Sequence, residues 1–166
     1  MYPVRLGYET AVKRINKLNE NGHHAEALVT SVFTVEKTLR RTLREIVVSA
    51  GFASKFADKI IGKLRGFDAI KSAWEMYEPN NEKLTNIIAA VDWKLFVDAA
   101  SMRNEMVHGV RVYDLSVCED KSSEVLDALD RLKTLLDKRY GFSGWETCSK
   151  RIKHRLHLDP KVRISE

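Results

Sequence analysis

The stretch from Asp92 to Gly109 reads DWKLFVDAASMRNEMVHG and decides the fold. It is predicted to be a helix, because Asp92 is a good N-cap, Gly109 is a good C-terminal stop and no residue between them breaks a helix. At about 100° per residue, its apolar side chains fall on two adjacent stripes. These residues are Trp93, Phe96, Val97, Ala100 and Val107 on one stripe, and Leu95, Ala99, Met102 and Met106 on the other. A helix that is apolar around most of its circumference is expected to be buried from more than one side.

A single cation interrupts this apolar surface. Arg103 falls between the two stripes, whereas His108 lies at the border of the polar arc, one turn beyond Asn104. Burial of an unpaired guanidinium costs several kcal/mol. The sequence therefore predicts an anionic partner for Arg103.

The best candidate for that anion is Glu36, in a long helix expected over residues 25–50. Glu36 falls inside the apolar arc of this helix, which is also expected to bury Phe33. Two cations are candidate partners: Arg40, one helical turn along the same helix, and Arg103 on the other helix. We expect Glu36 to contact Arg103, because Arg103 needs an anion more than Arg40 does.

The rest of the chain is typical of a helical bundle. Apolar residues recur at helical spacing over residues 8–20, 25–50 and 119–140, and shorter helices are expected between residues 51 and 91. Only three Pro and eight Gly occur in 166 residues, as suits a chain of long helices. The sequence thus predicts an all-α, up-and-down helical bundle with two long central helices and no sheet of consequence.

The distribution of charge divides the chain into a body and a tail. Residues 1–148 hold 22 Lys and Arg against 21 Asp and Glu, whereas residues 149–166 hold six against two. We expect a helical domain over 1–148 and a basic C-terminal tail over 149–166, which favours a polyanionic partner. The tail residues expected to bind nucleic acid are Lys150, Arg151, Lys153 and Arg155.

Several function classes lack their sequence signatures. The chain has no Gly-rich phosphate loop, Walker pattern, HExxH, CxxC pair or G-x-S-x-G elbow, which argues against a nucleotide kinase, a zinc enzyme and a serine hydrolase. Cys118 and Cys148 show no metal-ligand spacing and suit a reducing compartment. The chain also lacks a signal peptide and any apolar run of membrane length. We expect a cytoplasmic protein with no metal, no cofactor and no membrane association.

The sequence RNEMVH at residues 103–108 resembles the R-N-x-x-x-H signature of HEPN domains. The resemblance implies a small all-helical domain that usually forms a homodimer and, in active members, a metal-independent endoribonuclease. Arg103 would be the motif arginine, Asn104 the polar residue after it and His108 the motif histidine, with the site built from both chains. Many members of the family are toxin–antitoxin or phage-defence components, so the resemblance also implies an antitoxin or another regulatory protein as a partner.

The sequence departs from one branch of this family at a single position. Members that are paired with nucleotidyltransferase antitoxins carry a Tyr two residues after the motif His, and this chain has Val110 there. The nearest tyrosine is Tyr113. The resemblance to this branch therefore implies no modification of Tyr113.

The residue types at 103–108 suit cleavage of RNA without a metal. Attack by the ribose 2′-hydroxyl needs a base, the 5′-leaving oxygen needs an acid, and the phosphorane needs cations. Histidine serves as base or acid near neutral pH, and arginine holds a phosphate in bidentate fashion. One chain supplies one Arg103 and one His108, so a complete site needs two copies related by a two-fold axis. Asn104 would orient the imidazole or hydrogen-bond the phosphate, and the expected product is a 2′,3′-cyclic phosphate.

Two non-catalytic interpretations stay open beside this one. In the first, the bundle is an interaction or scaffold module, Arg103 is a structural cation paired to Glu36, and His108 caps a helix end where the dipole favours its charged form. In the second, the basic tail is the functional part and the bundle is its platform for nucleic-acid binding. The enzyme requires His108 to be accessible to solvent beside Arg103, whereas a purely structural role would seal His108 in a core.

Overall fold

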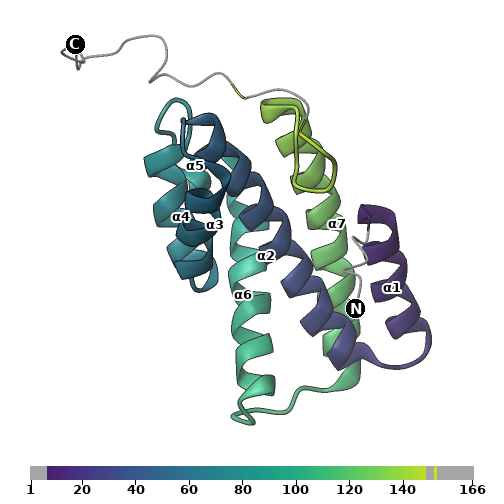
Figure 1. The fold of residues 1–166 in the computed structure, drawn as a ribbon. Helices are drawn as coiled ribbons and strands as arrows, with labels where there is room; N and C mark the ends of the chain where they lie inside the picture. The colour runs from purple at the N-terminus through teal and green to yellow at the C-terminus, as the bar shows by residue number, and fades with distance from the viewer. Residues whose placement is uncertain (1–6, 149–151, 153–166) are drawn as a thin grey trace, which may run out of the picture.

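The computed structural model describes residues 7–148 and residue 152, and these residues form an all-helical fold (Figure 1). Seven helices occur in this part of the chain: α1 (Tyr8–Glu20), α2 (His24–Ser49), α3 (Ser54–Lys63), α4 (Gly66–Tyr77), α5 (Leu84–Ile87), α6 (Ala90–Val107) and α7 (Leu115–Tyr140). No strand is present among the described residues, so the predicted all-α class is confirmed.

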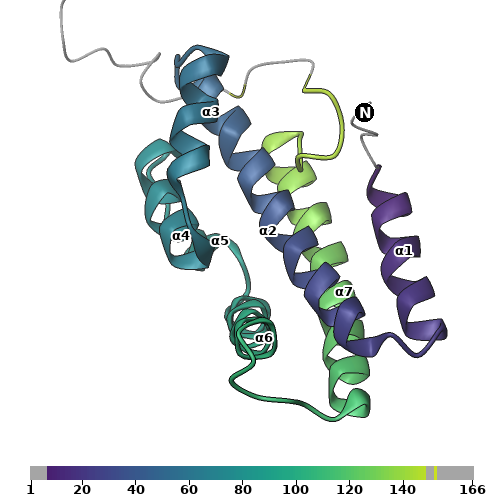
Figure 2. The ribbon, with the colours of Figure 1, turned by 60° about the horizontal axis from the view of Figure 1, so that its bottom comes forward.

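The central helix of the bundle is α2. Figures 1 and 2 show α1 and α7 on one side of it and α6 on the other, with α3 and α4 against its C-terminal half. The two longest helices, α2 and α7, have 26 residues each and lie side by side. α2 contacts α1, α3, α4, α6 and α7, so it organises the packing of the whole bundle.

The hydrophobic core lies where the apolar seams of these helices meet. Side chains spaced three and four residues apart face one way on a helix, and here they converge on the interior from α2 and α7. The buried residues of this seam are Leu28, Val32, Val35, Leu39, Leu43 and Ile46 from α2 and Val125, Leu129, Leu132 and Leu136 from α7. Trp74 of α4 and Phe96 of α6 extend the same core to the other side of α2.

A return segment after α7 packs directly on the backbone of α2. Gly144 has a φ of +87°, and a Cβ at this position would lie 2.5 Å from the Cβ of Arg41, so only glycine fits. The indole N–H of Trp145 donates to the hydroxyl of Thr38 at 2.9 Å. Thr38 in turn donates to the carbonyl of Thr34 at 2.8 Å. This hydrogen bond of Trp145 ties the return segment to α2.

The structure corrects the start of α6. The helix begins at Ala90 rather than at a cap on Asp92. The Asp92 carboxylate instead pairs in bidentate fashion with Arg131 of α7, with Oδ1 2.6 Å from NH2 and Oδ2 3.1 Å from Nε. The prediction of an Asp92 N-cap is therefore wrong, because a distant arginine takes the carboxylate. α7 also begins earlier than predicted, at Leu115 instead of residue 119.

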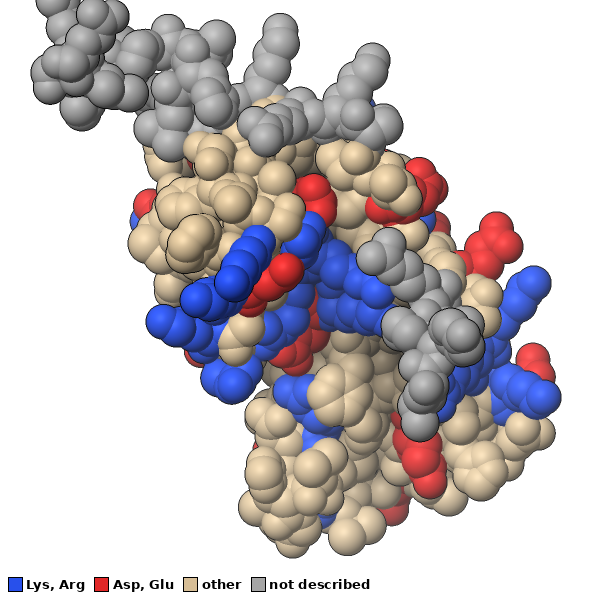
Figure 3. All heavy atoms as spheres, in the orientation of Figure 1, with Lys and Arg blue, Asp and Glu red and all other residues tan. Residues whose placement is uncertain are grey.

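The C-terminal end of α6 and the loop after it lie at one end of the bundle (Figure 1), where the Met106 sulfur is 3.9 Å from Sγ of Cys118 in α7. In Figure 3, which has the orientation of Figure 1, this lower part of the face is mostly free of Lys, Arg, Asp and Glu. A band of Lys and Arg crosses the middle of the same face, over α2 and α3. The molecule thus presents a largely uncharged surface and a basic surface next to each other.

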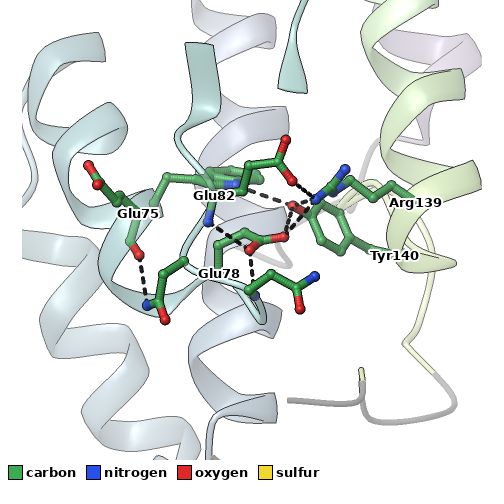
Figure 4. A network of polar contacts seen from close by, with 8 residues as sticks. Glu75, Glu78, Glu82, Arg139 and Tyr140 are labelled. Carbon is green, nitrogen blue, oxygen red and sulfur yellow. Dashed lines mark hydrogen bonds and ion pairs between the residues drawn. The ribbon is translucent and has the colours of Figure 1, made fainter. Parts of the chain in front are cut away.

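A buried carboxylate ties the end of α4 to the end of α7 (Figure 4). Glu78 is 1% exposed, and its Oε2 accepts the backbone N–H groups of Asn80 at 2.6 Å and Glu82 at 3.0 Å. Its Oε1 accepts Arg139 at 3.0 Å and the Tyr140 hydroxyl at 3.1 Å. Burial by itself raises the pKa of a carboxyl group, but these four donors outweigh it and hold the pKa of Glu78 below its ordinary value.

We predict that Glu78→Gln lowers the free energy of unfolding by about 1.5–3 kcal/mol at neutral pH, because charge-assisted hydrogen bonds are lost. The pKa of Glu78 is lower in the folded state than its ordinary value of 4.5. The stability that it contributes is therefore present above that value and is lost as the pH falls through the folded-state pKa. Urea denaturation at neutral and acidic pH measures the difference between the two proteins, which should shrink in acid.

The matched control for this prediction is Glu75→Gln, on the exposed side of α4. Surface substitutions of this kind change the free energy of unfolding by less than about 0.5 kcal/mol. A difference between wild type and Glu78→Gln that is the same at every pH would contradict the argument.

Candidate functional site

The three motif residues differ in how far they are buried. Arg103 is 9% exposed and faces α2, whereas Asn104 and His108 are exposed. Neighbouring side chains on a helix point about 100° apart, while residues four apart point the same way. Asn104 and His108 consequently share one open side of α6, beside the covered side that holds Arg103.

Arg103 lies between α6 and α2. Its NH1 is 3.7 Å from Oε2 of Glu36, and its guanidinium carbon is 4.9 Å from the centre of the Phe33 ring. The predicted contact between Glu36 and Arg103 is confirmed. The Nε of Arg103 is buried and has no hydrogen-bond partner among the described residues. The guanidinium is thus held in place while part of its donor capacity stays unused.

Glu36 divides its carboxylate between two arginines. Oε1 accepts the Nε of Arg40 at 3.0 Å and lies 2.9 Å from NH2 of the same side chain, while Oε2 faces Arg103. The shorter contacts therefore go to Arg40, the partner that we expected to be the lesser one. One helical turn brings Arg40 within direct reach, whereas Arg103 must reach across the interface between α2 and α6.

Arg40 also caps α3, a role that the sequence did not reveal. Its NH1 donates to the carbonyl of Ile61 at 2.9 Å and its NH2 to the carbonyl of Leu64 at 2.6 Å. Cations at a helix C-terminus satisfy its last carbonyls and complement its dipole. Through Arg40 and Glu36, the C-terminal end of α3 is linked to Arg103.

His108 ends α6 and its ring is open to solvent. Its backbone N–H donates to the carbonyl of Asn104 at 3.0 Å, and its imidazole makes no hydrogen bond to the described residues. Gly109 follows with a φ of +66°, which turns the chain away from the helix. Nearby, the Tyr113 hydroxyl donates to Glu105 at 2.8 Å, and this hydrogen bond raises the pKa of Tyr113.

Exposed apolar side chains surround the open side of α6. Val97 is 41% exposed and Val107 is 60% exposed, and Phe33 of α2 is 53% exposed. Within one chain, α6 is covered from more than one side, by α2, α5 and α7, and of its two apolar stripes only Val97 and Val107 are exposed. The prediction that Phe33 is buried is wrong. Phe33 lies at the edge of the interface between α2 and α6, where it covers the guanidinium of Arg103 rather than the core.

The described part of the chain holds no group of three or more His, Cys, Asp and Glu side chains placed to share a metal ion. The helices described here are too short or too polar to cross a bilayer. The expected nucleic-acid contacts of the tail, Lys150, Arg151, Lys153 and Arg155, lie outside the described residues.

Comparisons with models of protein families, with curated proteins and with solved structures find no match to this chain. The resemblance to HEPN domains is thus a prediction that depends on residues 103–108 and on the all-helical fold.

We predict that Glu36→Ala destabilises the protein by about 3–5 kcal/mol, because it leaves Arg103 as an uncompensated buried charge. Chemical denaturation measures this loss. Glu26→Ala, at an exposed position near the start of the same helix, is the matched control and should cost less than about 1 kcal/mol. Exchanging both partners for apolar side chains, Glu36→Leu with Arg103→Met, should recover most of the loss. An effect of Glu36→Ala no larger than that of the control would contradict a structural role for the pair.

Proposed function

We propose that the protein is a metal-independent endoribonuclease of the HEPN type, acting as a homodimer with Arg103, Asn104 and His108 of both chains around one cleft. The observation that carries this proposal is the arrangement along α6. A buried arginine with an unused donor lies beside an asparagine and a histidine that are open to solvent. A phosphate bound by Arg103 would lie near Asn104 and His108 on the same helix.

Arg103 has the properties of a phosphate clamp. Its Nε lacks a partner among the described residues, and its contact with Glu36, at 3.7 Å, is long for an ion pair. A phosphate bound at the guanidinium would accept charge-assisted hydrogen bonds in the geometry that guanidinium groups favour. Glu36 and Phe33 already position the side chain, so little conformational entropy is lost when the phosphate binds.

His108 would move the protons of the reaction. The imidazole of one chain takes the proton of the ribose 2′-hydroxyl as the oxygen attacks phosphorus. The P–O5′ bond breaks, and the imidazolium of the other chain gives its proton to the departing 5′-oxygen. Each cycle leaves a 2′,3′-cyclic phosphate and exchanges the protonation states of the two histidines. The exposure of His108 meets the requirement that substrate can reach it.

The exposed apolar side of α6 supports the homodimer. Val97 and Val107 border Asn104 and His108, so a partner that covers the valines brings its own motif residues close. A role as a toxin or phage-defence component, with an antitoxin as partner, follows from the resemblance to the family alone.

A non-catalytic interaction module is the second candidate function. The pairing of buried Arg103 with Glu36 favours it, because a guanidinium that only completes an internal ion pair needs no substrate. In that case, the apolar side of α6 would bind a protein partner and His108 would do no chemistry.

We predict that the purified protein cleaves single-stranded RNA in the presence of EDTA and that His108→Ala lowers the rate at least about 100-fold, as loss of an acid–base group does. The fold should be unchanged, because His108 is exposed at a helix end. His23→Ala, at an exposed histidine that precedes α2, is the matched control and should retain full activity. Absence of cleavage, or equal cleavage by His108→Ala, would leave the interaction module as the function.

We further predict that Val97→Asp shifts the dimer to monomer and reduces cleavage in proportion, because a carboxylate on the apolar side of α6 cannot be paired there. Sedimentation velocity measures the association state. Val91→Asp is the matched control, since Val91 is exposed on the same helix but points about 120° away. Cleavage by a protein that stays monomeric at all concentrations would contradict a site shared between two chains.

A further inference from the structure

The nearly neutral body of the protein carries its charge unevenly. Residues 33–65 hold eight Lys and Arg against three Asp and Glu, whereas the rest of residues 1–148 hold 14 against 18. This segment spans most of α2 and all of α3, and Figure 3 shows a band of Lys and Arg over these two helices. The expectation that the basic character belongs to the tail alone therefore overlooked a second basic region in the folded body.

α3 contributes a row of three lysines to this region. Lys55, Lys59 and Lys63 are four residues apart, so they lie on one side of the helix about 6 Å from one to the next. All three are exposed, and none of them forms an ion pair with a described residue. Like charges at this spacing destabilise a helix by about 0.2–0.5 kcal/mol per pair. An external anion would relieve the repulsion within this row.

α2 adds two cations held against an aromatic ring. Lys37 and Arg41 are one turn apart, and their charged groups lie 5.4 Å and 5.2 Å from the centre of the Trp145 ring. Burial and the charge of Arg41 lower the pKa of Lys37. The ring fixes where both side chains lie, but it neutralises neither charge.

The lysine row leads toward the candidate site. Lys63 is the last residue of α3, and the carbonyls at that end, of Ile61 and Leu64, are held by Arg40. Arg40 shares the Glu36 carboxylate with Arg103. One chain of charged contacts therefore joins the C-terminal end of α3 to the guanidinium of Arg103.

We propose that Lys37, Arg41, Lys55, Lys59 and Lys63, here called the basic face, bind the phosphate backbone of single-stranded RNA and direct it to Arg103. The separation of the three α3 lysines is close to that of consecutive phosphates in an extended strand. Phe56, exposed beside Lys59, and Phe33, exposed beside Arg103, offer rings on which bases can stack. Only the destination of the strand depends on the proposed nuclease; the binding surface itself does not.

The test measures binding without cleavage, using the full chain and a fluorescent 2′-O-methyl oligoribonucleotide that lacks the attacking hydroxyl. Fluorescence anisotropy over a range of salt concentrations gives the Kd and its salt dependence. The triple variant Lys55→Gln, Lys59→Gln, Lys63→Gln should weaken binding at least about tenfold at low salt. It should also reduce the slope of log K against log salt by about 2, since each cation on a single strand contributes roughly 0.7. Circular dichroism should show an unchanged helix content.

The matched control removes three charges from α1, through Lys13→Gln, Arg14→Gln and Lys17→Gln. These residues are exposed on a helix that lies on the other side of α2 from α3 (Figures 1 and 2). The control should bind like the unmodified protein. Equal losses in the two triple variants, or no loss in either, would overturn the basic face and leave binding to the tail.

The remaining outcomes distinguish this inference from the nuclease. Selective loss of binding in the α3 variant, with no RNA cleavage by the unmodified protein, supports the basic face and removes the nuclease. Cleavage by the unmodified protein, with binding and cleavage unchanged in the α3 variant, removes the basic face and keeps the nuclease. Binding to phosphatidylserine vesicles, with none to the oligonucleotide, would overturn the proposal in favour of a membrane surface.

Discussion

The rest of the structure depends on the packing of α2, which five other helices contact. A helix in that position must bury polar groups as well as apolar ones, and the buried threonine hydroxyl groups of α2 find acceptors within the helix itself. Its buried hydroxyl groups donate to carbonyls of the preceding turn, at 2.7–2.9 Å for Thr34, Thr38 and Thr42. These hydroxyl groups are short and their protons are already hydrogen-bonded within the helix. The return segment with Gly144 and Trp145 can therefore approach the helix backbone closely.

The charged groups of the interior lie at junctions between helices. Glu36 joins α2 to α3 through Arg40 and to α6 through Arg103, and Glu78 joins the end of α4 to the end of α7. Such pairs add less stability than apolar packing would, but they restrict which helix faces can meet. The pairing at Glu36 fixes one side of α6 against α2. The neighbouring side, with Val97, Asn104 and His108, is left accessible.

This arrangement places three surfaces next to each other. The open side of α6 carries the exposed Val97 together with Asn104 and His108, buried Arg103 lies on the neighbouring side, and the basic face begins at the end of α3. An enzyme that cleaves RNA at a shared site needs all three: a surface for its second copy, groups that move protons, and cations that hold the backbone. Each surface is ordinary by itself, and their proximity is what makes the proposed function coherent.

The sequence by itself determined the helices and the misplaced charges. Helical spacing of apolar residues predicted the long helices within a few residues, and Glu36 and Arg103 stood out as charges on apolar faces that would meet. Only the tertiary structure decided which partner each charged side chain binds. Asp92 pairs with Arg131 instead of capping α6, and Arg40 caps α3 as well as binding Glu36. It likewise decided that Phe33 is exposed and that the cations of α2 and α3 form one surface. The physical reason is that periodicity gives the direction in which a side chain points along its own helix. Which neighbour covers that direction depends on contacts between residues far apart in the chain.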